Sequence, residues 1–426
     1  MMVGDQIYEL CKELFPINRS LTGDGVRETL SILRRELPGL NIMSMPSGSR
    51  CFDWTVPKEW NVREAYIVCP NGEKICDFSL NNLHLVGYSI PIHETVDLEV
   101  LQEHLHSLPE LPDAIPYVTS YYKEKWGFCI SQQERDRLKP GSYTVHIDSK
   151  LEDGELNYAE LLIKGDSDEE IFLSSYICHP SMGNNELSGP TVLTYLTKYI
   201  MSMANRRYSY RIVFIPETIG SIVYLSKNLV VMKERIVAGF NLSCVGDNNA
   251  YSFLPSRNEN TLADRVALHV LQHFVDEFVE YSFADDRGSD ERQYCAPGID
   301  LPVCSIMRSK YAEYDEYHTS LDNLDFISAE GLDGAYQAYV KVFDVLESNF
   351  TYKINVLCEP QLGSRGLYPQ ESTKDTWGIV KNMMNICAYA DGTKDLVAIA
   401  DKISIPAWDL IDIVSKFKKS KLLEKV

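Results

Sequence analysis

Residues 170–190, EIFLSSYICHPSMGNNELSGP, join an apolar strand to a helix through a polar loop. The strand ends at His179, and the loop then places Asn185 and Glu186 directly before Ser188–Gly189. A histidine, amides and a carboxylate at the end of a buried strand are compatible with three structures. These are a metal site, a hydrogen-bonded turn, and the remnant of a metal site. The flanking sequence helps to decide among them.

Apolar strands alternate with helical patterns on both sides of this stretch. YRIVFIPE (210–217) and VAGFNLSCVG (237–246) are two such predicted strands. The alternation predicts a mostly parallel sheet covered by helices, in which ligand sites lie at the carboxyl ends of the strands. His179 and Glu217 each follow a strand end, so we expect a functional site at that edge.

Composition and charge bound the classes of protein to which the chain can belong. Its 426 residues suffice for two or three domains. A formal charge of −20 argues against a general nucleic-acid or anionic-membrane binder. No stretch is apolar for long enough to cross a bilayer, and the N-terminus is predicted to be an amphipathic helix, not a signal peptide. Eleven scattered cysteines without a CxxC pair indicate reduced thiols and a cytoplasmic location.

The character of the sequence changes along the chain and predicts several units. The predicted division is 1–48 and 116–350 for the α/β domain, 49–115 for an inserted β-rich domain, 351–375 for a linker rich in Pro, Gly and Ser, and 376–426 for a winged-helix or related helix-turn-helix unit. Within the α/β part, residues 143–151 and 154–165 are predicted to pair as a hairpin.

Five sites with chemically active side chains follow one another in a fixed order. They are His179, the pair Asn185–Glu186, Glu217 in IPETIGS, Asp290 in RGSDERQY, and His318 in EYHTSLDNLDFI. Two neutral imidazoles and one carboxylate are a ligand set that zinc uses when a fourth position must stay open. Glu217 is then either the base that takes a proton from water or a further ligand.

This order of strands and motifs resembles the zinc aminopeptidase superfamily, which includes glutamate carboxypeptidase-like and glutaminyl-cyclase-like proteins. YHTSLDNLDFI resembles its closing motif and implies that His318 is a metal ligand. SDERQY…APGIDLPV resembles its SDH…F…GIP stretch and implies that Asp290 lies beside the metal or the substrate. The whole chain is still more similar to a bacterial aminopeptidase-like branch with an inserted protease-associated-like β domain and a C-terminal winged helix.

The resemblance implies a three-layer αβα phosphorylase/hydrolase-like fold and metal-dependent hydrolysis of an amide bond, of aminopeptidase type. Asn185, however, stands where the superfamily has an Asp that bridges two zinc ions, and Pro216–Glu217 stands where it has two adjacent glutamates. We therefore expect one zinc ion per chain, held by His179, Glu186 and His318. Glu217 and Asp290 are the predicted catalytic residues.

Other interpretations of these residues stay open at this point. Glu217 could cap the helix that follows it, and Asp290 could form an ion pair with Arg287 or Arg292. The substitutions could equally mark a non-hydrolytic ligand- or partner-binding protein, or the C-terminal unit could make the chain a regulator that contacts DNA.

The expected partner is a small-molecule or peptide substrate, and not a membrane. The overall negative charge suggests a substrate with a cationic end. Nucleic acid is expected, if at all, only through the C-terminal unit. The sequence is compatible with a monomer and with a homo-oligomer.

Overall fold

The computed structural model describes residues 2–367 and 374–426. Its central sheet has eight strands, β1 (Asn41–Pro46), β10 (Glu155–Ile163), β11 (Glu170–Tyr176), β12 (Ser209–Ile215), β13 (Ile236–Asn241), β14 (Ser252–Leu254), β15 (Val279–Glu280) and β16 (Val303–Met307). They lie in the order β1-β10-β12-β11-β13-β16-β14-β15. The middle strands β12, β11, β13 and β16 are parallel, and antiparallel pairs flank them on both sides.

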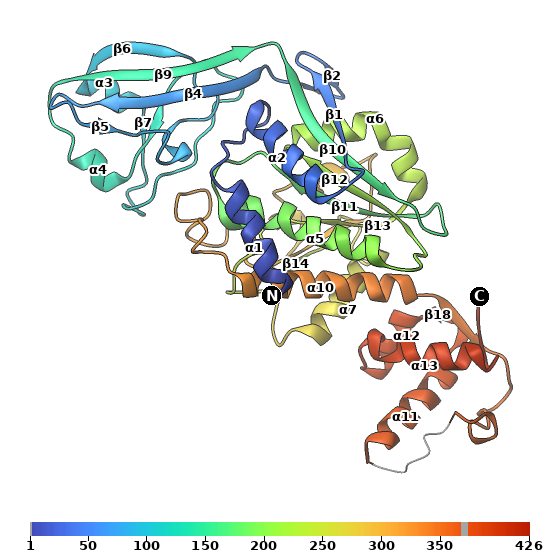
Figure 1. Cartoon of the computed structure of the whole chain (residues 1–426). Helices are drawn as coiled ribbons and strands as arrows, with labels where there is room; N and C mark the ends of the chain where they lie inside the picture. The colour runs from blue at the N-terminus through green and yellow to red at the C-terminus, as the bar shows by residue number, and fades with distance from the viewer. Residues whose placement is uncertain (1, 368–373) are drawn as a thin grey trace.

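Helices cover both faces of this sheet (Figure 1). One face carries α1 (Val3–Leu14), α2 (Asp24–Glu36), α5 (Ser188–Ser202), α7 (Leu262–Phe274) and α10 (Ala329–Ser348), and the other carries α6 (Ile219–Arg235), with the short α8 (Phe283–Asp286) and α9 (Glu291–Tyr294) nearby. Alternate residues of β11 explain the two layers. Ile171 and Leu173 pack with the first set of helices, whereas Phe172 packs with α6. This mixed, three-layer arrangement confirms the predicted α/β fold.

The insertion forms an antiparallel sheet of its own. Its order is β5-β4-β9-β6, with β4 (Glu59–Val68), β5 (Lys74–Ile75), β6 (Ile92–Asp97) and β9 (Ser142–Glu152). Smaller elements complete it: β2 (Arg50–Cys51), β3 (Trp54–Thr55), η1 (Asn82–His84), α3 (Leu98–Glu103), β7 (Leu105–His106), β8 (Phe128–Cys129) and α4 (Gln132–Asp136). Because β9 supplies a central strand, the chain that builds this sheet extends well past residue 115, the predicted end of the insertion.

The hairpin predicted for 143–151 and 154–165 is wrong. β9 pairs with β4 and β6 in the insertion, whereas β10 pairs with β1 and β12 in the central sheet. The chain thus passes from one sheet to the other within two residues. An alternating pattern identifies a strand but not the strand with which it pairs.

The C-terminal unit, residues 350–426, is a winged helix. It contains α11 (Lys374–Tyr389), α12 (Leu396–Ile403), α13 (Ala407–Lys419) and a three-stranded sheet of order β18-β17-β19, with β17 (Thr351–Ile354), β18 (Asp391–Asp395) and β19 (Leu423–Lys425); η3 (Gly363–Arg365) lies before α11. β17 is the central strand, so the unit begins within the predicted linker 351–375. Residues 368–373 of that linker lie outside the described residues.

Two further features bear on the sequence expectations. All eleven cysteines are free thiols. Among residues 2–367 and 374–426, no helix is both long and apolar enough to span a membrane.

Candidate active site

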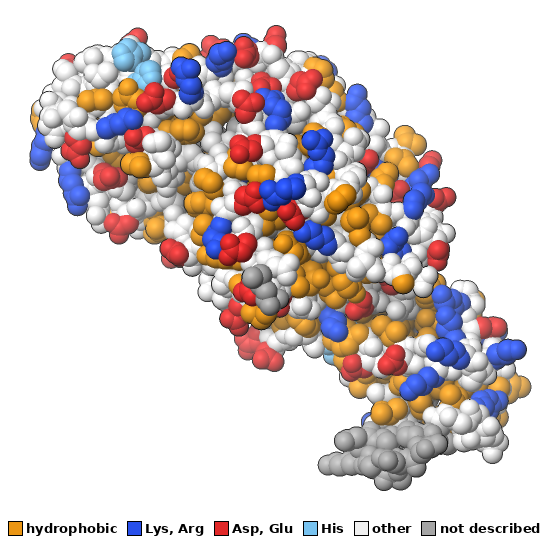
Figure 2. Space-filling view, in the orientation of Figure 1, with side chains coloured by type: hydrophobic (Ala, Val, Ile, Leu, Met, Phe, Trp, Pro, Cys, Tyr) orange, Lys and Arg blue, Asp and Glu red, His pale blue; other side chains and the backbone are white. Residues whose placement is uncertain are grey.

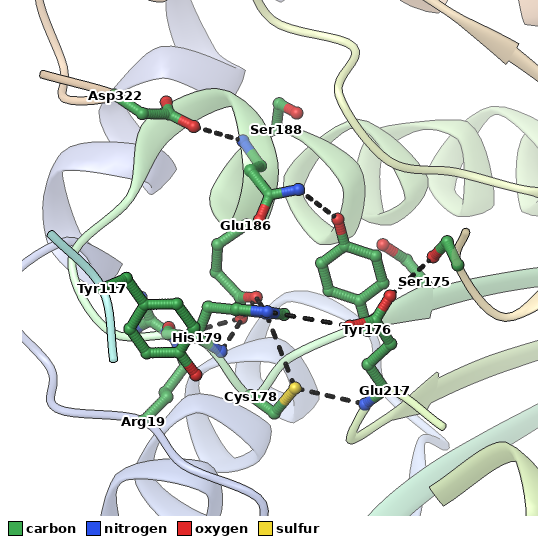
Figure 3. A network of polar contacts seen from close by, with 12 residues as sticks. Arg19, Tyr117, Ser175, Tyr176, Cys178, His179, Glu186, Ser188, Glu217 and Asp322 are labelled. Carbon is green, nitrogen blue, oxygen red and sulfur yellow. Dashed lines mark hydrogen bonds and ion pairs between the residues drawn. The ribbon is translucent and has the colours of Figure 1, made fainter. Parts of the chain in front are cut away.

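Two neighbouring parallel strands, β11 and β12, end at the same edge of the sheet. His179 follows the end of β11 and Glu217 follows the end of β12, so the two side chains meet, with His179 Nε2 3.7 Å from Glu217 Oε2 (Figure 3). His318 comes from the loop between β16 and α10, and its ring centroid lies 5.3 Å from that of His179. The structure therefore brings three of the five predicted side chains to one place.

Glu186 lies behind His179. Its Oε2 accepts hydrogen bonds from the backbone N–H and from Nδ1 of His179, both at 3.0 Å. Burial raises the pKa of Glu186 to about 8 and lowers the pKa of His179 to about 3. With Nδ1 occupied as a donor, the neutral imidazole directs the lone pair of Nε2 towards Glu217. The ligand role predicted for Glu186 stays a prediction, and its observed contacts orient His179.

Arg19 completes this buried arrangement and was not found from the sequence. Its side chain is fully buried, and Nε lies 3.3 Å from Glu186 Oε1. The same Nε donates a hydrogen bond to the carbonyl oxygen of His179 at 3.0 Å. A second donor reaches the carbonyl oxygen of Leu14 at 2.7 Å. The guanidinium thus links the end of α1 to the loop after β11. No local pattern around Arg19 signals a partner 160 residues away.

A strained turn positions Glu217. Thr218 has φ +62° and ψ −74°, and the N–H of Ile219 donates to the carbonyl oxygen of Glu217 at 2.7 Å. This is a γ-turn with positive φ at a β-branched residue, a rare and unfavourable conformation. The side chain of Glu217 is held from the other end, because its Oε1 accepts from Ser289 Oγ at 2.9 Å. Strain of this kind persists where the surrounding contacts enforce it.

Asp290 supplies those enforcing contacts. Its Oδ1 accepts from the backbone N–H of Thr218 at 2.7 Å and from Ser221 Oγ at 2.8 Å. Its Oδ2 is buried and has no hydrogen-bond partner among the described residues. Burial raises the pKa of Asp290, and burial together with the Asp290 charge raises the pKa of Glu217. Asp290 forms no ion pair with Arg287 or Arg292, which was the alternative left open by the sequence.

His318 is a half-buried residue whose Nε2 atom is fully buried. It adopts φ +56°, its carbonyl oxygen accepts from the N–H of Tyr117 at 2.8 Å, and its ring stacks on Tyr317 with centroids 3.9 Å apart. Nε2 is buried without a hydrogen-bond partner in the part of the chain that the structure describes. Burial and the neighbouring His179 lower the pKa of His318 to about 3, so the ring is neutral.

The NNELSG loop is a tight turn that Asp322 organises. The carboxylate of Asp322 accepts from the backbone N–H groups of Asn184, at 2.5 Å, and Asn185, at 2.9 Å. The Asn185 amide donates to the hydroxyl of Tyr176 at 3.0 Å. Gly189 is required because a Cβ there would lie 2.5 Å from the carbonyl oxygen of Leu242. Asp322 lies in the motif YHTSLDNLDFI, and the motif gives no sign that this carboxylate anchors a loop some 140 residues earlier.

These residues open onto a cleft of about 380 Å³. Its polar lining consists of His179, Glu217, Thr218, Arg292 and His318, and its aromatic lining of Trp54, Tyr117, Tyr121 and Tyr122. The aromatic residues come from the insertion and from the segment that follows β7. Neither Glu186 nor Asp290 lines the cleft. The insertion therefore covers the strand-end site from one side.

The imidazole nitrogens that face the cleft are of a type that can bind a zinc ion. His318 Nε2 is buried and unpaired, His179 Nε2 is oriented by a carboxylate behind it, and both rings are neutral, as metal binding requires. The ligand atoms of His179, Glu186 and His318 do not all lie within 4.8 Å of one another, and their joint role as a ligand set stays a prediction.

In residues 2–367 and 374–426, one group of His, Cys, Asp or Glu side chains brings three ligand atoms within 4.8 Å of one another. That group is His269, His273 and Asp401, at the junction of α7 and α12. His269 is already fully engaged there, because Nδ1 contacts Asp401 at 2.5 Å and Nε2 accepts from the N–H of Ala407 at 2.8 Å.

Comparison with known proteins agrees with this architecture. A family model described as a domain of unknown function (DUF4910) matches residues 8–349, and a model described as winged helix-turn-helix matches residues 350–425. A Clostridium acetobutylicum protein is 48% identical over 366 residues, which are 86% of this chain and 83% of that protein. It bears the provisional description of a polysaccharide biosynthesis protein with an aminopeptidase-like domain.

Two solved structures extend the comparison. A Clostridium acetobutylicum crystal structure, provisionally described as a peptidase, has 42% identity and a TM-score of 0.93 and covers 100% of this chain and 97% of its own. A zinc aminopeptidase from Bacillus subtilis has 12% identity and a TM-score of 0.56 and covers 79% of this chain and 93% of its own. At that identity the second likeness shows the fold alone, which is the zinc aminopeptidase fold.

Proposed function

This chain belongs to the family described as a domain of unknown function, DUF4910, and we propose that it is a metal-dependent hydrolase that cleaves an amide bond in the cleft between His179 and His318. The zinc aminopeptidase fold supports this reaction class. The observation that carries the proposal is the buried Nε2 of His318, which has no hydrogen-bond partner within residues 2–367 and 374–426 and shares the cleft with the oriented imidazole of His179 and the carboxylate of Glu217.

We propose His179 and His318 as the protein ligands of one zinc ion. Glu186 acts from behind, because its hydrogen bond to Nδ1 of His179 holds the imidazole in one tautomer and one orientation. A bound zinc ion supplies Lewis-acid polarisation of the scissile carbonyl group. This assignment replaces the predicted ligand role of Glu186 with a positioning role.

Glu217 is the proposed base. Its carboxylate faces the cleft, is held by Ser289, and has a raised pKa because it is buried near Asp290. A carboxylate with a raised pKa takes a proton from water more readily than an ordinary one and can return it to the leaving amine. Asp290 acts through the turn at Thr218, which fixes the direction of the Glu217 side chain.

The test is turnover of a panel of model amides by the zinc-supplemented protein and by Glu217→Gln. We expect hydrolysis of at least one amide, reduced by a factor of about 100 or more in Glu217→Gln because general-base catalysis contributes about that much. Glu313→Gln is a matched control, because Glu313 is an exposed carboxylate outside the cleft lining. Hydrolysis that is equal in Glu217→Gln and the wild type would contradict the proposed base.

A second candidate function is ligand binding without hydrolysis. It is favoured by the amide of Asn185, which is committed to a hydrogen bond with Tyr176 at the position where the superfamily it resembles has a bridging Asp. Pro216 likewise stands where that superfamily has the first of its two adjacent glutamates. A binding protein would show no turnover of any amide in the panel and would keep its ligand affinity in Glu217→Gln.

A further inference from the structure

Arg292 places a positive charge in the cleft. It lies in α9, two residues after Asp290, and its side chain is exposed and lines the cleft together with Glu217 and His318. One terminal nitrogen donates to Thr218 Oγ1 at 2.9 Å. No carboxylate forms an ion pair with Arg292 anywhere in the described chain. Most donors of its guanidinium fork are therefore available to a ligand.

The cleft offers little to a ligand with a free ammonium group. Glu217 is the single acidic side chain among the lining residues, and one of its oxygens already accepts from Ser289. The nearby Glu291 is fully buried, and its carboxylate accepts from the N–H groups of Gly288 and Ser289. A planar carboxylate, in contrast, matches a guanidinium fork with two parallel hydrogen bonds.

Two aromatic side chains stand at the rim of the same cleft. Trp54 is 39% exposed and Tyr122 is 64% exposed, and their ring centroids lie 6.5 Å apart with an interplanar angle of 58°. Both come from the insertion, whereas Arg292 comes from α9 of the α/β domain. Exposed aromatic faces of this kind bind apolar or ring-shaped groups.

We propose that the cleft selects a substrate that carries a carboxylate, which Arg292 binds, and an apolar or ring-shaped group that lies against Trp54 and Tyr122. Turnover of this molecule rests on the proposed hydrolase function, whereas binding of its carboxylate does not require turnover. A substrate with a carboxylate is the opposite of the cationic substrate end expected from the net charge of −20. The positive charge of Arg292 in the cleft outweighs the distant negative charges, because salt screens those.

The experiment compares two probes that share an aromatic side chain and differ in charge. N-acetyl-L-phenylalanine has a free carboxylate and a blocked amine, and L-phenylalanine amide has a free amine and a blocked carboxylate. Binding of each is measured by calorimetry to the wild type and to Arg292→Gln. We expect the wild type to bind the carboxylate at least tenfold more tightly than the amine, and Arg292→Gln to lose that preference, because hydrogen bonds to a charged group are worth about tenfold to a hundredfold in affinity.

Two variants serve as controls. Arg287→Gln removes a nearby guanidinium that contacts the carbonyl oxygens of Phe283 and Ala284 outside the cleft, and it should keep the preference. Glu217→Gln should also keep it, so that an inactive protein with an Arg292-dependent preference would separate the carboxylate site from a failed hydrolase proposal.

Three results would overturn the inference. They are tighter binding of the amine, a carboxylate preference that persists in Arg292→Gln, and no measurable binding of the carboxylate. The second result would arise if a metal ion, and not Arg292, held the carboxylate.

Discussion

The two histidines of the cleft illustrate what burial does to a single side chain. Nε2 of His318 has no hydrogen-bond partner among the described residues, and His179 is neutral because burial, together with the charge of Arg19, lowers its pKa. The sequence predicted both histidines as site residues, because His179 follows an apolar strand and His318 lies in the motif YHTSLDNLDFI. It could not predict that Glu186, seven residues after His179, turns back to hold that ring, because the path of the loop depends on the distant Asp322.

The pH dependence of the free energy of unfolding tests the burial of the His318 ring. Its pKa is about 3 in the folded protein and about 6.5 when unfolded, so the unfolded chain binds more protons between these values. Stability is then fully present above pH 6.5 and is lost as pH falls towards 3. In metal-free protein, we expect the free energy of unfolding to fall between pH 6.5 and 5 by about 2 kcal/mol less in His318→Gln than in the wild type. Urea unfolding at the two pH values measures this difference. Equal losses would show that the ring is solvated.

The γ-turn at Thr218, which follows the end of β12, is the element on which the site depends. The sequence predicted the strands and the edge where they end, because apolar runs and helical periodicity are local properties. It did not predict the γ-turn at Thr218, because IPETIGS also fits an ordinary helix start. It mispaired β9 with β10 for a related reason, since strand partners are set by the two separate cores and not by sequence proximity.

Asp290 is the contact that we expect to maintain this turn. Asp290→Ala leaves the N–H of Thr218 without its acceptor, at about 1–3 kcal/mol for a buried donor, whereas the hydroxyl of Ser221 keeps the carbonyl oxygen of Thr218 as an acceptor. Asp290→Asn keeps an acceptor oxygen of the same shape and should cost less. Thermal and urea unfolding of the two variants, with zinc content as a second readout, check this order. If Asp290→Asn and Asp290→Ala were equally unstable, the charge and not the acceptor geometry would be what holds the turn.

Across the whole molecule, the winged helix packs on the α/β domain. The first helical N–H of α13, on Ala407, donates to His269 Nε2 at 2.8 Å, and Arg265 forms an ion pair with Asp395 at 2.7 Å. One continuous hydrophobic cluster runs through both units. On the face that Figure 2 shows, acidic and basic side chains are interspersed over the α/β domain, and basic ones are more frequent over the C-terminal unit.

This packing engages the helix end that winged-helix proteins use to contact bases. We therefore expect no salt-dependent affinity of the full chain for duplex DNA between 50 and 200 mM salt, measured by fluorescence anisotropy. His269→Ala, which removes the contact to Ala407, is the matched variant. If the wild type bound duplex DNA with an affinity that fell steeply with salt, the packing of the winged helix on the α/β domain could not be the state that meets DNA.

Elemental analysis of untagged, zinc-supplemented protein shows whether His179 and His318 hold one metal ion at the strand ends. We expect about one zinc per chain, lost in His179→Ala and in His318→Ala. His273→Ala should keep the zinc, since it alters the other group of potential ligands, at α7 and α12. No zinc in the wild type, or zinc that survives both cleft variants and disappears in His273→Ala, would contradict this zinc assignment.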